Sequence, residues 1–207
     1  MEKTDTQMNR DASKPYLSQN NFNDWLKDPG LVRTWHHDRK NMPKPTPETQ
    51  ALFDFGRLMH RKAQELYPDG FEDTRKLGYD EHLENSQKLL ERRIPLFELG
   101  FQHDNLYARP DIMVPSGDDA WDMIEIKSTP KLFENDVKYV AFLYYVVVQC
   151  GIKISKCYLM LLKQGVYARQ EMSAEDIFEK TDVTGKIIEL QEYIKDAILA
   201  MRELSKK

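Results

Sequence analysis

The sequence predicts a single α/β domain in which helices flank a mixed central β-sheet. With 207 residues, 41% of them hydrophobic, the chain is long enough to bury one sizeable core. The apolar pattern changes along the chain in the order helix, strands, helix, strand, helix, which is typical of a mixed sheet covered by helices. Residues 136–151 are apolar almost all round, which predicts a helix buried in that core and ended by Gly151.

Composition and cysteine usage limit the classes of function. Charged residues make up 31% of the chain and the net charge is −4, so affinity for nucleic acid would have to come from a local basic patch. No apolar stretch suits a membrane span, and the polar start lacks the apolar core of a signal peptide, so we expect a cytoplasmic protein with no membrane partner. Cys150 and Cys157 are predicted to be reduced core thiols. Residues 1–14 predict a disordered tail, followed by one domain over residues 15–207.

Helix signals dominate the first third of the chain. Near-helical apolar spacings in residues 17–40, interrupted at 28–30 by Asp-Pro-Gly, predict two short helices around a turn. Thr46 suits an N-cap and Pro47 a first helical position, so a longer helix is expected to begin there. We expect that helix to end at residues 68–70, where proline and glycine follow the last apolar repeat.

Strand signals follow a further helix that precedes residue 94. A hairpin turn is predicted at residues 103–105, between the first two strands. The C-terminal residues 187–204 form an amphipathic pattern that predicts a single helix. The predicted strands are residues 94–101, 107–114, 121–128 and 156–162.

A carboxylate and an ammonium group occupy the third predicted strand. Strand side chains alternate between faces, so Glu125 and Lys127 share one face. Pro110 cannot donate to a sheet ladder, which fits a strand that begins at Asp111, and a hairpin through residues 115–119 would return Glu125 beside it. Adjacent carboxylates repel each other unless a cation lies between them, and Mg²⁺ or Mn²⁺ is the expected ion. Such an ion activates water and polarises a phosphate, while Lys127 would orient that water or offset charge on the phosphorus. A solvent-facing Glu–Lys pair is the ordinary alternative.

The spacing of these residues resembles a known nuclease pattern. Pro110 and Asp111, thirteen intervening residues, and the sequence EIK at 125–127 resemble the PD-(D/E)XK nuclease superfamily. Residues 53–70, FDFGRLMHRKAQELYPDG, resemble the helix that carries a histidine in its RecB-like branch, and Gly56 and His60 match that motif. The resemblance runs from about residue 17 to the C-terminal helix. It implies a restriction-endonuclease-like fold, with a mixed central sheet flanked by helices.

The resemblance also implies an activity and a set of site residues. It predicts a Mg²⁺- or Mn²⁺-dependent nuclease that hydrolyses phosphodiester bonds in DNA, in DNA repair, recombination or defence. Asp111, Glu125 and Lys127 would be catalytic, and the metal ligands would be His60, Asp111, Glu125 and the backbone carbonyl of Ile126. Iron–sulfur members use four cysteines and this chain has two, so it resembles the cluster-free type.

Three positions relate less directly to the family pattern. Glu98 stands where relatives often keep an acid, so it would belong to a second shell or help to hold a second ion, with a solvent-facing glutamate as the alternative. Relatives usually carry a glutamine on the helix after the EIK strand, but Leu143 occupies that place. Tyr145 is a candidate hydroxyl in its stead, with a core position as the alternative. The missing glutamine bears on DNA positioning and turnover.

Basic residues near the expected site are candidate phosphate contacts, and a solvated surface is the alternative for each. The candidate phosphate contacts are Lys88, Arg92, Arg93, Arg109 and Lys131.

The remaining histidines are not expected to bind a metal. Adjacent His36 and His37 point about 100° apart on a helix and suit a solvated pair better than a chelate, and His82 and His103 are expected at the surface.

Three functions remain open at the level of the sequence. The first is the DNA nuclease. The second is a nucleic-acid-binding module that keeps the fold and the metal pocket without turnover, acting in a larger nucleic-acid-processing assembly, and Leu143 favours it. The third is an interaction domain without a metal.

Overall fold

A five-stranded mixed sheet forms the centre of the structure, a computed structural model that describes residues 15–72, 77–166 and 171–206. The predicted tail, residues 1–14, lies outside these ranges. Within the sheet β6 and β7 are parallel, and the other neighbouring pairs are antiparallel. Its strands, in spatial order, are β2 (Leu96–Phe97), β5 (Ile112–Ser116), β6 (Ala120–Ile126), β7 (Lys153–Leu162) and β8 (Phe178–Asp182).

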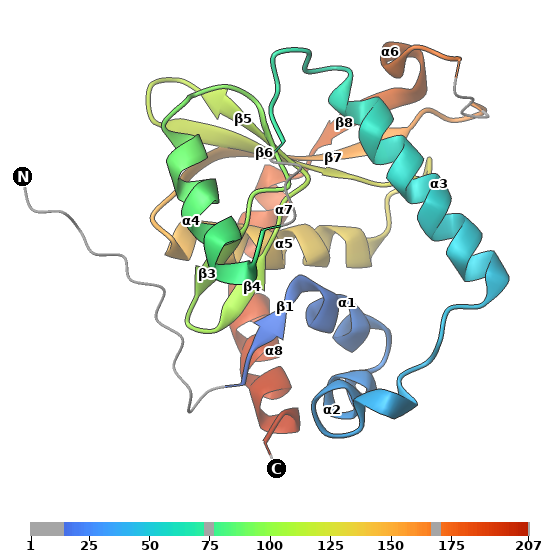
Figure 1. Cartoon of the computed structure of the whole chain (residues 1–207), viewed down its shortest axis with the longest axis vertical. Helices are drawn as coiled ribbons and strands as arrows, with labels where there is room; N and C mark the ends of the chain where they lie inside the picture. The colour runs from blue at the N-terminus through green and yellow to red at the C-terminus, as the bar shows by residue number, and fades with distance from the viewer. Residues whose placement is uncertain (1–14, 73–76, 167–170, 207) are drawn as a thin grey trace, which may run out of the picture.

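The parallel pair is joined by the buried helix that the sequence predicts. Helix α5 (Glu134–Gln149) crosses from β6 to β7, as a parallel connection requires, and runs beneath the sheet in Figure 1. Its apolar residues Val140, Phe142 and Val146 are inaccessible to solvent. The helix ends where Gly151 adopts a positive φ of 81°, a conformation that glycine takes at little cost.

Helix α3 (Pro47–Gln64) covers the other face of the sheet. The Thr46 side chain accepts a hydrogen bond from the backbone of Thr49, which confirms the predicted N-cap. Met59 of α3 packs in one cluster with Ile124 of β6, whereas the adjacent Met123 belongs to the cluster around α5. Because neighbouring strand residues point to opposite faces, α3 and α5 enclose β6 from both sides. The mixed sheet flanked by helices is thereby confirmed.

A second, smaller sheet lies against one end of the first, with helices around it (Figure 1). Its strand order is β1-β4-β3. The two short helices predicted around a turn are present as α1 and α2, and Asp28 caps the second through a hydrogen bond from Gly30. The elements here are β1 (Leu17–Ser18), α1 (Gln19–Lys27), α2 (Pro29–His37), a 3-10 turn η1 (Arg39–Asn41), α4 (Tyr79–Leu90), β3 (Phe101–His103) and β4 (Leu106–Ala108).

Two predicted strands were wrong because each is divided between the two sheets. The expected strand 94–101 breaks at Glu98, whose φ of 57° ends β2 before β3 begins. The expected strand 107–114 breaks around Pro110, which has no N–H for a ladder, so β4 and β5 are separate. The predicted hairpin turn at residues 103–105 is confirmed between β3 and β4, where Asp104 and Asn105 both have positive φ.

The C-terminal region also differs from the single predicted helix. A break at Leu190 separates α7 (Thr184–Glu189) from α8 (Gln191–Leu204). Strand β8 was not predicted because it is a sheet edge whose residues 179–182 are mostly exposed, so the segment lacks a strong apolar alternation. The short helix α6 (Ala174–Ile177) precedes it.

The described part of the chain contains no helix whose length and apolar character would suit a membrane crossing. Both cysteines are free thiols, as predicted. Burial raises the pKa of Cys157 to about 12, so this thiol stays protonated and behaves as a core residue.

Arg93 is expected to stabilise the fold. Its guanidinium donates hydrogen bonds of 2.9 Å to the carbonyls of Gly117 and Ala120 and lies 4.6 Å from the ring centroid of Trp121, so it fixes the turn between β5 and β6. Arg93→Ala should lower the free energy of unfolding by about 2 kcal/mol, measured by urea denaturation. Arg92→Ala, which removes a contact with Phe71, should cost at most about 1 kcal/mol. Equal losses would contradict the bracing role.

Candidate metal centre

The β5–β6 hairpin brings two buried carboxylates together. Ile112 pairs with Ile124, so Asp111 and Glu125 occupy the next opposed positions, as the sequence predicted. The backbone N–H of Ile126 donates to Asp111 Oδ2 over 2.7 Å, which fixes that carboxylate at the strand end. Asp111 is 6% exposed and Glu125 4% exposed, so both are largely removed from solvent.

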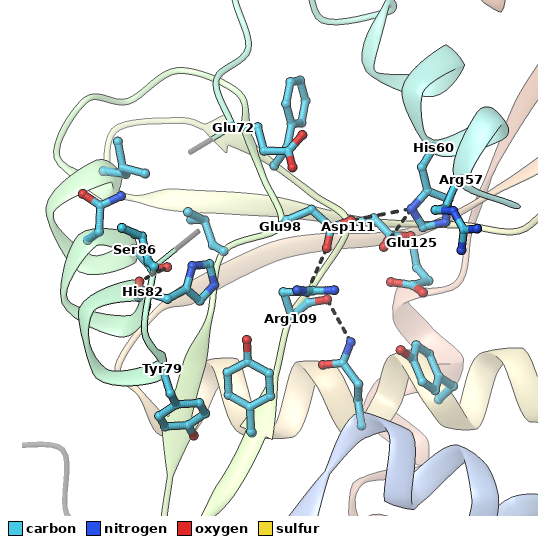
Figure 2. Close-up of a pocket in the computed structure, with 18 residues that line it drawn as sticks. Arg57, His60, Glu72, Tyr79, His82, Ser86, Glu98, Arg109, Asp111 and Glu125 are labelled. Atoms are coloured by element: carbon cyan, nitrogen blue, oxygen red, sulfur yellow. Dashed lines mark hydrogen bonds and ion pairs between the residues drawn. The ribbon is translucent and has the colours of Figure 1, made fainter. Parts of the chain in front are cut away.

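His60 on α3 and Glu98 between β2 and β3 complete a potential ligand set around Asp111. His60 Nδ1 lies 3.6 Å from Glu98 Oε1 and 3.6 Å from Asp111 Oδ1. One ligand atom from each of the three residues lies within 4.8 Å of the others. Figure 2 shows the imidazole directed at the two carboxylates. One nitrogen and several oxygens within reach of a single point suit Mn²⁺, and the oxygens suit Mg²⁺.

The sequence leaves open a second-shell role, help with a second ion or a solvent-facing position for Glu98, and the structure places it in the inner group of potential ligands. It holds a left-handed backbone conformation, with φ at 57°, which is costly for a residue with a side chain. Its N–H donates to the carbonyl of Asp111 over 3.1 Å, and Arg109 Nε lies 2.8 Å from its Oε2. The surrounding contacts thus hold a strained residue with its carboxylate in the site.

Glu125 lies beside this group, and within the described part of the chain only one of its two carboxylate oxygens has a hydrogen-bond partner. Its Oε1 is 3.3 Å from Lys127 Nζ, whereas Oε2 is buried and has no hydrogen-bond partner among the described residues. An unsatisfied buried carboxylate oxygen is unfavourable, and a cation at this point would satisfy it. The donor set of imidazole and carboxylates, together with this orphan oxygen, fits a divalent metal ion.

The ammonium group of Lys127 packs against the site and does not line its open side. Nζ lies 4.3 Å from the ring centroid of Tyr139 on α5, in addition to its contact with Glu125. Burial alone lowers the pKa of Lys127, but attraction to Glu125 and then Asp111 outweighs it, and the net pKa is raised. Lys127 therefore stays protonated and acts as a hydrogen-bond donor and positive charge.

Crowding of acids shifts both hairpin carboxylates toward their neutral forms. Burial, and then the charge of Glu98, raise the pKa of Asp111 to about 7. Burial, and then the charge of Asp111, raise the pKa of Glu125 to about 8. Protons thus relieve the repulsion that a cation would otherwise relieve.

The strand geometry also places the Ile126 carbonyl. The N–H and C=O of one strand residue point to the same side, as in an antiparallel pair that exchanges both bonds. Because the N–H of Ile126 donates to Asp111, its carbonyl faces the Asp111 side as well. This is the orientation that the predicted backbone ligand requires.

The predicted site opens into a cleft of about 630 Å³. Of the candidate phosphate contacts, Arg109 lines this cleft, and Arg57, which the sequence did not single out, lines it too. The other predicted basic residues make contacts elsewhere: Arg92 lies over Phe71, Arg93 holds the hairpin turn, Lys131 lies over Phe133, and Lys88 is exposed on α4.

The helix position that departs from the family pattern is a core position. Leu143 is fully buried in the main hydrophobic cluster, and Tyr145 packs at the edge of that cluster and does not line the cleft. A carboxamide reaches the cleft from α1 instead: Gln19 donates to the carbonyl of Arg109 over 3.2 Å, and its Oε1 is buried without a partner in the described ranges. Tyr139 also lines the cleft. Nothing local in the sequence marks Gln19, which lies 90 residues before Arg109.

No protein-family model matches the chain, and no curated protein matches it significantly. The assignment of a function therefore depends on the geometry of the site.

Glu98 is expected to contribute to metal affinity. Glu98→Gln keeps the shape of the side chain but removes its charge, so the dissociation constant for Mn²⁺, measured by calorimetric titration, should rise at least about tenfold. Glu72→Gln alters another carboxylate of the cleft, outside the group formed with His60 and Asp111, and should leave the constant unchanged. Identical constants for Glu98→Gln and the wild type would exclude Glu98 as a ligand.

The raised carboxyl pKa values predict an unusual pH dependence of stability. The ordinary pKa values are 3.8 for Asp111 and 4.5 for Glu125, so between about pH 4 and pH 8 the metal-free folded protein holds protons that the unfolded chain has released. The midpoint of thermal unfolding in EDTA should fall as pH rises through this window, and less steeply in Asp111→Asn. Mn²⁺ should stabilise more at pH 8 than at pH 5, because it competes with those protons. If the unfolding midpoint falls equally steeply with pH in Asp111→Asn and the wild type, Asp111 does not carry the proton that this prediction assigns to it.

Proposed function

We propose that the protein is a metal-dependent DNA nuclease of the PD-(D/E)XK type, RecB-like and without an iron–sulfur cluster. The convergence of His60, Glu98 and Asp111 beside Glu125 and Lys127 supports this proposal most strongly. These residues come from α3, the β2–β3 connection and the β5–β6 hairpin, and the hairpin supplies the acid pair and lysine that the motif demands.

The finer fold assignment belongs to the same proposal. A mixed sheet with an antiparallel hairpin, a parallel neighbour reached through α5, and α3 on the opposite face supports a restriction-endonuclease-like arrangement. The ends of β5 and β6 then carry the acidic residues. A cytoplasmic location is proposed because Cys150 and Cys157 are free thiols.

Each site residue has a role in phosphodiester hydrolysis. Asp111, His60 and Glu98, with Glu125 and the Ile126 carbonyl beside them, would hold Mg²⁺ or Mn²⁺. When bound, the ion supplies an activated water and neutralises charge on the phosphate. Lys127, held protonated beside Glu125, would orient the attacking water or offset the charge that develops on the phosphorus. Attack of the water oxygen on phosphorus breaks the P–O3′ bond and leaves a 5′-phosphate, by family analogy.

Arg109 and Gln19 would position the substrate. The Arg109 side chain is 48% exposed at the cleft, and Glu98 holds its Nε, so the remaining guanidinium N–H groups can meet a phosphate. Gln19, fixed through Nε2, offers a carboxamide in the cleft where the family pattern would bring one from the helix position of Leu143.

Loss of Lys127 should slow turnover strongly without abolishing metal binding. Purified protein incubated with single- and double-stranded DNA and Mn²⁺ should release cleavage products, and Lys127→Ala should slow cleavage about 100-fold or more. Lys131→Ala removes a neighbouring exposed lysine and should cleave at the wild-type rate. EDTA should stop cleavage by the wild type and by Lys131→Ala. Cleavage by Lys127→Ala at the wild-type rate would contradict the catalytic role of Lys127.

The second candidate is a nucleic-acid-binding module without turnover, acting in a larger nucleic-acid-processing assembly. Leu143 favours it, because the helix position that carries a glutamine in the family pattern is here buried in the core. Binding of DNA and Mn²⁺ without release of products would support the module over the enzyme. The third possibility raised by the sequence, an interaction domain without a metal, predicts no heat on titration with Mn²⁺.

A further inference from the structure

The cleft extends beyond the carboxylates to a wall formed by α4. Tyr79, His82, Ser86 and Leu89 follow one another at spacings of three or four, so they share one face of the helix, and all four line the cleft. Figure 2 shows this wall on the opposite side of the cleft from His60 and Arg57, with Arg109 between the two sides.

Close packing holds this wall in place. Ser86 Oγ accepts a hydrogen bond of 2.9 Å from the N–H of Gly100 and donates one of 2.8 Å to the carbonyl of His82. A Cβ at position 100 would lie 2.6 Å from His82 Cδ2, so glycine just before β3 leaves the room in which the His82 imidazole packs against the backbone. The position of the imidazole is therefore set by the backbone on which it rests.

Tyr107 of β4 adds a second aromatic ring to the same end of the cleft. Its ring centroid lies 5.3 Å from that of Tyr79, whose hydroxyl donates to Gln102 over 2.6 Å. Leu99 also lines the cleft. This end thus offers aromatic and aliphatic surface with hydroxyl and amide groups at its margin, whereas the carboxylates of the metal centre lie at the other end, beyond Arg109.

We propose that the α4–β4 end of the cleft is a binding slot for an unpaired nucleobase, which makes single-stranded DNA, or a frayed DNA end, the substrate class. The inference rests on the proposed nuclease function and deepens it. A nucleobase is a flat apolar ring with polar edges, and aromatic side chains bind single-stranded nucleic acid by stacking on such rings. Paired bases in a duplex are stacked on each other, so their faces cannot enter a cleft of this kind.

The slot and the metal centre are connected in the way a nucleotide requires. Arg109 stands between them in the cleft, so a base among Tyr79, His82 and Tyr107 would have its phosphate near the guanidinium. The next phosphodiester would then reach the carboxylates. A volume of about 630 Å³ lies in the range of pockets that enclose small ligands, which suits a short stretch of unstacked nucleotides.

Binding measured without turnover tests the slot. A fluorescein-labelled deoxythymidine oligonucleotide is titrated with protein in Ca²⁺, and fluorescence anisotropy gives the dissociation constant, with a blunt duplex of mixed sequence as the comparison. Tyr107→Leu and Tyr79→Leu keep apolar bulk but remove the aromatic ring, and each should weaken single-strand binding about tenfold. Tyr144→Leu, which changes a tyrosine outside the cleft lining, should bind as the wild type does.

A stacking probe separates recognition from a loss of structure. An oligonucleotide with a terminal 2-aminopurine should lose fluorescence on binding to the wild type and retain it with Tyr107→Leu. Unchanged Mn²⁺ affinity in both tyrosine variants shows that the metal centre is still folded. Wild-type single-strand affinity in both variants, or tighter binding of the duplex by the wild type, would overturn the slot.

Failure of the slot and failure of the nuclease proposal give different results. If Lys127→Ala stops cleavage while the tyrosine variants bind single strands normally, the nuclease stands and the slot falls. If no DNA is cleaved but single-strand binding depends on Tyr79 and Tyr107, the slot stands and the protein is the binding module.

Discussion

Repulsion among buried carboxylates is the constraint around which this site is built. Asp111, Glu98 and Glu125 lie together at the strand ends, where little water can screen them. Without a cation, the repulsion is met by raised pKa values on the two hairpin acids and by contacts with Arg109 and Lys127. A divalent ion would replace bound protons and satisfy the orphan oxygen of Glu125. The carboxylate repulsion that destabilises the metal-free fold would therefore favour the binding of a cation at this site.

The rest of the fold serves to hold these groups in spite of that repulsion. The main-chain bond from Ile126 anchors Asp111, and the left-handed turn at Glu98 directs a third acid inward at a conformational cost. Helices α3 and α5 cover opposite faces of the hairpin, so that one supplies His60 and the other places Tyr139 under Lys127. The small sheet and α4 then extend the site into a cleft with chemically different ends.

Much of the architecture could be predicted because local signals were strong. The N-cap at Thr46, the turn around Asp28, the buried helix ended by Gly151 and the hairpin register of Asp111 and Glu125 follow from capping, turn chemistry and strand alternation. The predicted strands 94–101 and 107–114 failed because apolar runs do not reveal where a chain passes from one sheet to another. That change depends on a positive φ at Glu98 and on the missing N–H of Pro110, together with partners distant in sequence.

The sequence by itself determined the mixed α/β class, the hairpin that sets two acids side by side, and the lysine on the same strand face, because these depend on spacings of a few residues. Only the tertiary structure decided that Glu98 joins His60 and Asp111. It also decided that Gln19 and Tyr139 reach the cleft and that α4 forms one wall of that cleft. The contact of Arg93 with the β5–β6 turn depends on it as well. Those contacts join segments far apart along the chain. Their geometry is fixed by how helices and sheets pack, a property that no local pattern of residues encodes.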